Sequence, residues 1–147
     1  GQTFGGELHL VRAALAQSEE ASGNRFLLVT LDWLAQAQPS LDYRVTLRLL
    51  GDDGVWDSQQ DEYPIGPLLP PTTWHQGDAK PGYMVLPLPK TERPERYSIQ
   101  VGRYDPLTQR QITHSNQAGS SSAELVEIGE VEVKPGTEGV AFFAPQP

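Results

Sequence analysis

Strict alternation of apolar and polar residues is the feature that most constrains how this chain can fold. In residues 43–49 every second residue is apolar, and arginine or threonine lies between. A period of two indicates a strand of an antiparallel sheet, with one face in the core and the other in water. Residues 96–104 repeat the pattern, and in residues 25–35 one parity is apolar from Leu27 to Trp33 while the other is mixed. The residues expected to face the core are Leu27, Val29, Leu31, Trp33, Tyr43, Val45, Leu47, Leu49, Tyr97, Ile99 and Val101.

Residues that turn the chain separate these strands. The 14 glycines and 13 prolines together make up nearly a fifth of the sequence. The run Gly51-Asp52-Asp53-Gly54 predicts a hairpin, because an Asp-Gly pair tolerates the positive φ of a tight turn. About seven to nine short strands fit between such turns, so the sequence predicts an all-β fold: an antiparallel β-sandwich of the immunoglobulin or fibronectin type III kind.

The first strand is the most ambiguous. Its apolar positions change parity near Val11, which predicts an edge strand over residues 4–15 with a β-bulge. The polar residues 17–24 are interpreted as the turn that follows. A helix over residues 10–20 is the competing interpretation, because alanine and leucine are good helix formers.

Proline and glycine mark three later segments. Residues 63–80 contain four prolines and are interpreted as an ordered loop or as a crossing between the sheets. The strand 82–88 includes Pro87, which only an edge strand tolerates. The last strand, 124–134, changes parity at Gly129, which predicts a second bulge.

The whole chain, residues 1–147, is interpreted as a single β-sandwich domain. Within it, the serine-rich residues near 113–122 contain nothing apolar to hold them against a core, and we expect a mobile loop there. The tail, residues 135–147, is expected to be partly ordered.

The net charge of −8 argues against two classes of partner. A nucleic-acid-binding protein needs a basic face, and the 11 lysines and arginines are scattered along the chain. Adhesion to an anionic membrane surface is disfavoured for the same reason. No apolar run approaches the roughly 20 residues that span a bilayer. The chain also lacks an initiator methionine and a signal peptide, so we expect it to be part of a longer protein whose tether lies outside it.

No pattern of residues predicts a metal or cofactor site. The acidic hairpin at 52–62 is a calcium-site alternative, but it lacks the spacing of an EF-hand loop, and turn preference alone accounts for its aspartates. His9, His75 and His114 lie in different segments. There is no cysteine for a thiolate ligand or nucleophile. The sequence therefore predicts no metal and no cofactor.

A hydrolase is the least favoured function. Serines lie beside His114 in the serine-rich loop, at positions 115 and 120–122. A catalytic serine needs a base held within hydrogen-bond distance, and an unsupported loop does not hold that geometry. The sequence therefore predicts no catalytic residue and no enzymatic activity.

Aromatic residues give the candidate ligand-binding positions. Trp56, Tyr63 and Tyr83 fall near the hairpin and the proline-rich segment, where exposed rings can cover the apolar face of a sugar. Trp33 shares its parity with core residues and is expected inside. Trp74 is expected to pin a structural corner in place, followed by a turn at Gly77-Asp78.

Several short motifs carry a family resemblance. They are Leu49-Leu50-Gly51 in the hairpin, Trp74 followed by Gly77-Asp78, the run Leu86-Pro87-Leu88-Pro89, and Gly102-Arg103-Tyr104-Asp105-Pro106 after a strand. Together they resemble a β-sandwich domain of bacterial polytopic membrane proteins, some of which resemble glycosyltransferases that use polyprenyl-linked sugars. The resemblance implies an extracytoplasmic location, in the periplasm or at the cell surface. It supplies no catalytic residue.

The function predicted from these observations is that of a non-enzymatic accessory or interaction domain outside the cytoplasm. Its expected partners are transmembrane segments of the same polypeptide or a cell-surface glycan. The alternative is a carbohydrate-binding module that uses the exposed aromatic residues Trp56, Tyr63 and Tyr83.

Overall fold

β-strands form almost all of the secondary structure. The computed structural model describes residues 2–4, 7–19, 24–66, 68–112, 114–116, 122–123, 125–135 and 140–143. The described elements, in chain order, are β1 (Gln2–Phe4), β2 (Leu8–Glu19), β3 (Arg25–Ala35), β4 (Arg44–Gly51), β5 (Trp56–Glu62), the 3-10 helix η1 (Pro71–Thr73), β6 (Ala79–Pro87), β7 (Glu95–Asp105), β8 (Arg110–Ile112), β9 (His114–Asn116), β10 (Ser122–Ala123), β11 (Leu125–Val133) and β12 (Val140–Phe143).

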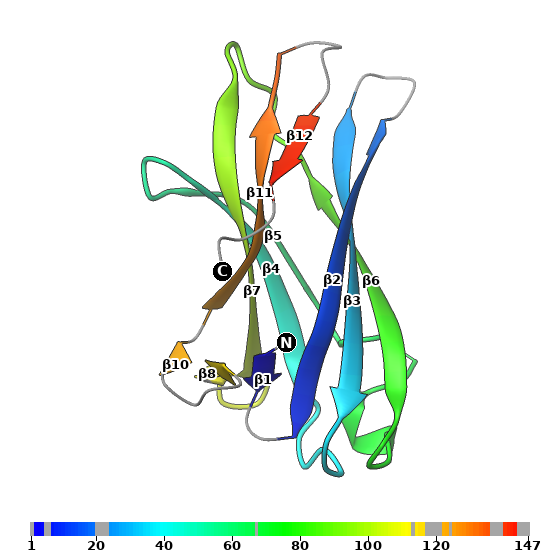
Figure 1. Cartoon of the computed structure of the whole chain (residues 1–147). Helices are drawn as coiled ribbons and strands as arrows, with labels where there is room; N and C mark the ends of the chain where they lie inside the picture. The colour runs from blue at the N-terminus through cyan, green and yellow to red at the C-terminus, as the bar shows by residue number, and fades with distance from the viewer. Residues whose placement is uncertain are drawn as a thin grey trace.

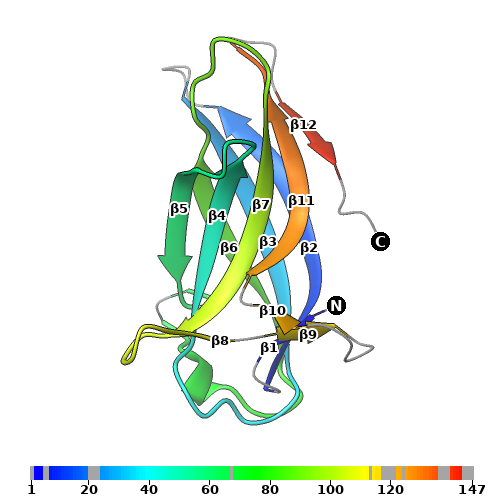
Figure 2. The ribbon, with the colours of Figure 1, turned by 90° about the vertical axis from the view of Figure 1, so that its left-hand side faces the viewer.

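The strands form two antiparallel sheets that face each other (Figure 1). One has the order β10-β9-β1-β2-β3-β6, and the other has the order β12-β11-β7-β4-β5, with β8 paired to β7. Figure 2 shows the second sheet in front, with β5, β4, β7 and β11 side by side. The long strands are β2, β3 and β6 in the first sheet and β4, β5, β7 and β11 in the second. The predicted all-β antiparallel sandwich is confirmed.

The core consists of the side chains that the alternation directs inward. Every predicted core residue is buried, and Trp33 has no exposed surface. Leu8, Leu86 and Val131 add to the same cluster from three other strands. Because both sheets contribute, removing this apolar surface from water stabilises their packing as well as each sheet.

Both predicted bulges are present. The pairing of β2 with β3 shifts register between Leu10 and Arg12, so Val11 is the extra residue. The pairing of β11 with β7 shifts between Glu127 and Gly129. Each bulge returns apolar residues to the core side after a change of parity, which is why the sequence pattern reveals it.

The first strand differs from the prediction in its bounds and its place. Gln2–Phe4 and Leu8–Glu19 form β1 and β2 in place of one edge strand over residues 4–15, and β2 pairs with β1 as well as with β3. The competing interpretation, a helix over residues 10–20, is wrong, because Arg12 to Glu19 pair with β3 residue by residue. The turn at 17–24 begins too early, since β2 continues to Glu19, and residues 20–23 lie outside the described part. Tertiary pairing with a strongly apolar neighbour overrides the helix propensity of alanine.

The serine-rich segment contains two short strands in its described residues. His114–Asn116 forms β9, which pairs with β1, and Ser122–Ala123 forms β10, which pairs with β9. Positions 113 and 117–121 lie outside the described part, and the mobility of the segment stays a prediction. In the predicted tail, Val140–Phe143 forms β12 against β11, while positions 136–139 and 144–147 are likewise outside it. These short segments become strands because they pair with the free edges of existing strands, and their own sequences carry no strand pattern.

The proline-rich segment crosses from β5 in one sheet to β6 in the other. Strand β6 is an edge strand with Pro81 and Pro87 near its ends, as predicted for Pro87. The crossing packs closely on it: a Cβ added at Gly82 would lie only 1.7 Å from the carbonyl oxygen of Pro64. Glycine is needed at this position because backbone approaches backbone.

A charged side chain lies inside the sandwich. Arg103 of β7 is fully buried, and its guanidinium carbon lies 4.9 Å from the ring centroid of Trp33 and 5.0 Å from that of Tyr43. Burial lowers the pKa of Arg103 to about 9, although interactions with Tyr43 and Glu7 oppose the shift. At neutral pH the group remains a cation held between two aromatic rings.

Glu7 places a negative charge close to Arg103 and its two aromatic rings. The Tyr43 hydroxyl donates to Glu7 Oε2 at 2.6 Å, and the Ser40 hydroxyl donates to Oε1 at 2.7 Å. Burial by itself would raise the pKa of Glu7, but these hydrogen bonds and the charge of Arg103 outweigh it and lower the pKa. Glu7 therefore ties the start of β2 to the entry of β4.

We expect Gly82→Ala to destabilise the fold by about 3 kcal/mol, because the new methyl group meets a backbone carbonyl that cannot rotate away. Gly54→Ala is the matched control: its φ is 80°, but an added Cβ there meets nothing within 4 Å. Strain alone should cost the control about 1–2 kcal/mol. Urea unfolding measures both variants, and equal losses would refute the contact between the crossing and β6.

Glu7→Gln should lose about 1 kcal/mol of stability at neutral pH, allowing for partial solvent screening of the hydrogen-bonded carboxylate. The folded-state pKa of Glu7 lies below its ordinary value. Its contribution is therefore complete above the unfolded-state pKa and is lost as pH falls through the folded-state pKa. Urea unfolding of parent and variant at neutral pH and near pH 3 should show the difference shrinking with acid. A pH-independent difference would contradict this role.

Candidate functional site

The structure does not gather the three predicted ligand-binding residues on one face. Trp56 begins β5, and its side chain lies outside the described part. Tyr63 follows the other end of β5 and is half-buried, with the guanidinium carbon of Arg44 lying 5.1 Å from its ring centroid. Tyr83 lies in the middle of β6, in the opposite sheet, and is 73% exposed. Of the two described side chains, only Tyr83 offers a largely open ring.

Tyr83 belongs to an apolar surface on the outer face of the β2-β3-β6 sheet. The exposed fraction is 49% for Val85 and 38% for Leu28. Register places these residues in two neighbouring cross-strand rows, Ala16–Leu28–Val85 and Ala14–Thr30–Tyr83. We call these six residues the apolar face. A contiguous exposed apolar area of this kind is typical of a surface that binds a partner.

Two hollows adjoin the apolar face. One, of about 330 Å³, lies over β2, β3 and β6 and has Leu28 and Thr30 among its lining residues. The other, of about 320 Å³, lies between β6 and the edge of β5. Both are lined by Tyr83, Met84 and Val85, so the two hollows lie next to the same stretch of β6.

The second hollow adds polar groups from β5. Gln60, Asp61 and Glu62 line it opposite Tyr83. The carboxylates are held in place by the chain itself, because the Tyr63 amide donates to Glu62 Oε1 at 2.8 Å and the Gln59 side chain donates to Asp61 at 3.1 Å. Neither lysine nor arginine is among the described residues that line these two hollows. The site therefore combines an open ring, an apolar floor and a negative rim.

A larger hollow of about 620 Å³ lies elsewhere, between the β4–β5 hairpin and the segment that precedes β7. Asp52 and Glu92 line it together with Lys90 and Arg93, so its charges are of both signs. Most of its side chains are exposed and no large apolar group other than Tyr97 contributes to it among the described residues. Size alone does not make it the better site, because a ligand pocket needs apolar contact as well as polar groups.

The histidines do not take part in a metal-binding group among the residues whose side chains are described. No group of three or more histidine, cysteine or acidic side chains is close enough to hold a metal ion among them. His75 is exposed, and its Nδ1 lies 3.9 Å from Asp78 Oδ2. The side chains of His114 and of the neighbouring serines lie outside the described part.

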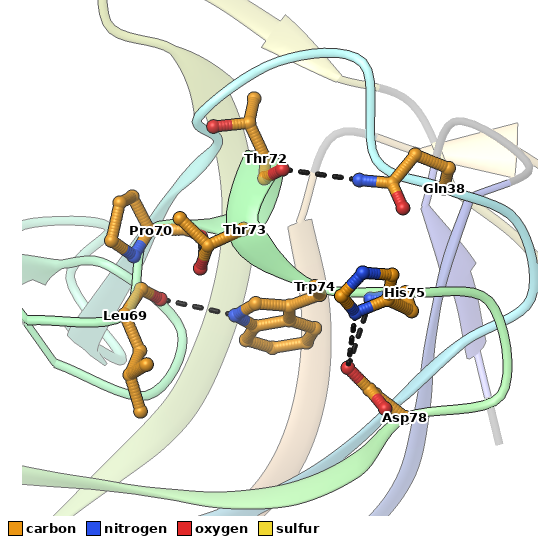
Figure 3. A network of polar contacts seen from close by, with 8 residues as sticks. All are labelled: Gln38, Leu69, Pro70, Thr72, Thr73, Trp74, His75 and Asp78. Atoms are coloured by element: carbon orange, nitrogen blue, oxygen red, sulfur yellow. Dashed lines mark hydrogen bonds and ion pairs between the residues drawn. The ribbon is translucent and has the colours of Figure 1, made fainter.

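The segment around Trp74 is a structural corner, as predicted (Figure 3). Trp74 is 1% exposed, and its Nε1 donates to the carbonyl oxygen of Leu69 at 3.0 Å. The amide of His75 donates to Asp78 Oδ2 at 2.8 Å, and Gly77 has a φ of 93°. The indole is used for packing and cannot be a sugar platform.

Leu28 and Val85 are the site residues that sequence reasoning missed. The signal was present in residues 25–35, where Phe26 and Leu28 place apolar side chains on the face opposite the core. A strand that is apolar on both faces is either covered on both or exposes one. Only the position of β3 between β2 and β6, with no layer of described residues over the outer face, decides between the two.

Comparison with models of protein families finds no match to this chain, and none of the curated proteins matches it in sequence. In the described ranges, no helix has the length and hydrophobicity that a membrane span requires.

Trp74→Ala should lower the free energy of unfolding by about 3–5 kcal/mol, because it opens a cavity in a close-packed corner. For a chain of this size we expect the melting temperature to fall by roughly 10 °C. Trp74→Phe keeps one aromatic ring and loses the bond to Leu69, so it should cost less, about 1–2 kcal/mol. Thermal unfolding checks both. A melting temperature of Trp74→Ala within a degree or two of the parent would show that the corner does not depend on the indole.

Proposed function

We propose that this chain is a non-enzymatic interaction domain that works outside the cytoplasm of a bacterium, beside membrane-spanning segments of a partner or of its own polypeptide. The observation that carries the interaction role is the apolar face, on which Tyr83, Val85 and Leu28 are all exposed. The extracytoplasmic location is supported by the resemblance of the turn and strand motifs to domains of bacterial polytopic membrane proteins.

Physical cost favours an interaction role for this face. The chain has 19 acidic residues, so it does not lack charged side chains with which to cover an outer face. Leaving leucine, valine and tyrosine side chains in adjacent rows in water forgoes the free energy of burying them, roughly 25 cal/mol per Å². A partner that covers the apolar face recovers that free energy, which is why such patches occur at interfaces.

The strand order supports the finer description of the fold. The first, second and fifth long strands, β2, β3 and β6, form one sheet, and β4, β5, β7 and β11 form the other. We propose that the sandwich is of the immunoglobulin or fibronectin type III kind, in which the third, sixth and seventh strands share a sheet. Domains of this kind host many unrelated functions, so the fold adds nothing to the choice of partner.

Carbohydrate binding is the second candidate, and one observation favours it. The open ring of Tyr83 lies beside the amide of Gln60 and the carboxylates of Asp61 and Glu62. A ring that covers a sugar's C–H face, with polar groups at its rim for hydroxyls, is the arrangement such a site needs. A glycan array, followed by calorimetric titration of any hit against parent and Tyr83→Ala, tests this candidate.

Site-specific photocrosslinking tests the interaction role. We expect a benzophenone amino acid at position 28 or 85, in cells that express the full-length gene, to crosslink to a membrane-embedded polypeptide. The same probe at position 127, on the outer face of the other sheet, is the control and should not. Equal yields from both sheets, or no product from either, would contradict an interface on the apolar face. We also expect the full-length gene to encode membrane-spanning segments.

A further inference from the structure

We infer that the partner presents a cationic extended segment in which an apolar side chain alternates with lysine or arginine, and that the two hollows around Tyr83 hold these two kinds of side chain. This inference rests on the proposed interaction role and names the chemistry of the partner. Its evidence is the distribution of charge and apolar surface between the hollows.

The hollow over β2, β3 and β6 suits an apolar side chain. Its lining is almost entirely aliphatic, with the Thr30 hydroxyl and Tyr83 as the polar exceptions. A sugar placed there would leave most of its hydroxyls without partners, which costs free energy for each buried group. A leucine, valine or isoleucine side chain has no polar group to desolvate, and it removes Leu28 and Val85 from water.

The hollow between β5 and β6 suits a cation. Asp61 and Glu62 line it from β5 and Tyr83 from β6, so an ammonium or guanidinium group placed there lies near negative charge and an aromatic ring. No basic residue of the described lining competes for these groups. The overall charge of −8 attracts the same partner over longer distances.

The spacing of the two hollows fits a strand-like segment. They share Tyr83, Met84 and Val85, so neighbouring side chains of one short peptide can reach both. In an extended chain, residues i and i+2 lie about 6.6 Å apart on one face, and residues i and i+1 point to opposite faces. A segment that runs beside the free edge of β6 can thus direct its apolar side chains to the face that carries Val85 and its cations to the opposite side, toward β5.

The difference from a glycan or a purely apolar partner lies in the rim. Asp61 and Glu62 are positioned by bonds from Gln59 and Tyr63, so they are ordered before a ligand arrives. Preorganised carboxylates beside an apolar floor select for a ligand that has both features. A neutral glycan would contact the Tyr83 ring but not the aliphatic residues of the first hollow. An uncharged apolar partner would make no ion pair with Asp61 or Glu62.

The test uses fluorescence anisotropy with a labelled seven-residue peptide in which lysine alternates with valine. Its controls are two peptides of equal length, one with glutamate in place of lysine and one with serine in place of valine. We expect the lysine–valine peptide to bind the parent, and both controls to bind at least ten-fold more weakly. Affinity should fall as salt rises from 50 to 300 mM, because the rim carboxylates are partly exposed.

Matched variants assign the binding to the rim. Asp61→Asn with Glu62→Gln removes two charges at the hollow and should weaken the lysine–valine peptide about five-fold, as two partly exposed ion pairs imply. Asp52→Asn with Glu92→Gln removes the same charge at the other hollow and should change the affinity less than two-fold. Circular dichroism melts confirm that each variant is folded, and equal effects of the two pairs would refute the rim as the cation site.

The outcomes separate this inference from the proposed function. Equal affinity for the lysine and glutamate peptides would overturn the cationic partner while leaving an apolar interaction surface in place. Tight binding of a neutral glycan that is lost in Tyr83→Ala, with no peptide bound, would overturn it in favour of a carbohydrate ligand. Absence of peptide binding together with absence of crosslinks from positions 28 and 85 would overturn both.

Discussion

A guanidinium held between two aromatic rings is the interaction around which the sandwich is organised. Arg103 comes from β7 and Trp33 from β3, so the stack joins the two sheets, while Tyr43 enters from the residue before β4. Taking a guanidinium out of water is costly, and the cost is offset only if its surroundings are arranged in one way. The rings and the Glu7 carboxylate supply that arrangement, so the ends of β2, β3, β4 and β7 are fixed together.

The two outer faces of the sandwich differ in character. The outer face of the β4-β7-β11 sheet is polar, with an ion pair between Arg96 and Glu130 and a hydrogen bond from Ser98 to Glu127. On the outer face of the β2-β3-β6 sheet, Arg12 pairs with Asp32, and the next two outward-facing rows form the apolar face. The chain thus concentrates its polar contacts on one sheet and leaves the other suited to contact with a partner.

The crossing from β5 to β6 connects the core to the candidate site. Its carbonyl at Pro64 lies directly against Gly82, one residue before Tyr83, and Trp74 pins its other end. These contacts hold the end of β5 near β6, which is why Glu62 and Tyr83 line the same hollow although they come from opposite sheets. The stiffness of the proline-rich segment therefore fixes the geometry of the surface, and a looser connection would let the rim move away from the apolar floor.

The sequence alone determined the all-β class, the core-facing residues and the positions of both bulges, because each strand's alternation records which face is buried. It also indicated the Trp74 corner, since prolines, a glycine and an aspartate dictate local backbone geometry. Tertiary structure decided what β2 became: its alanines suit a helix in isolation, but pairing with β3 made it a strand. Tertiary structure also decided the candidate site. Which edge of one sheet meets which edge of the other depends on the path of the crossing and on the buried stack, and no local pattern encodes that. The sequence therefore singled out Tyr83, but only the fold placed it with Leu28 and Val85 on one face and with Glu62 across a hollow.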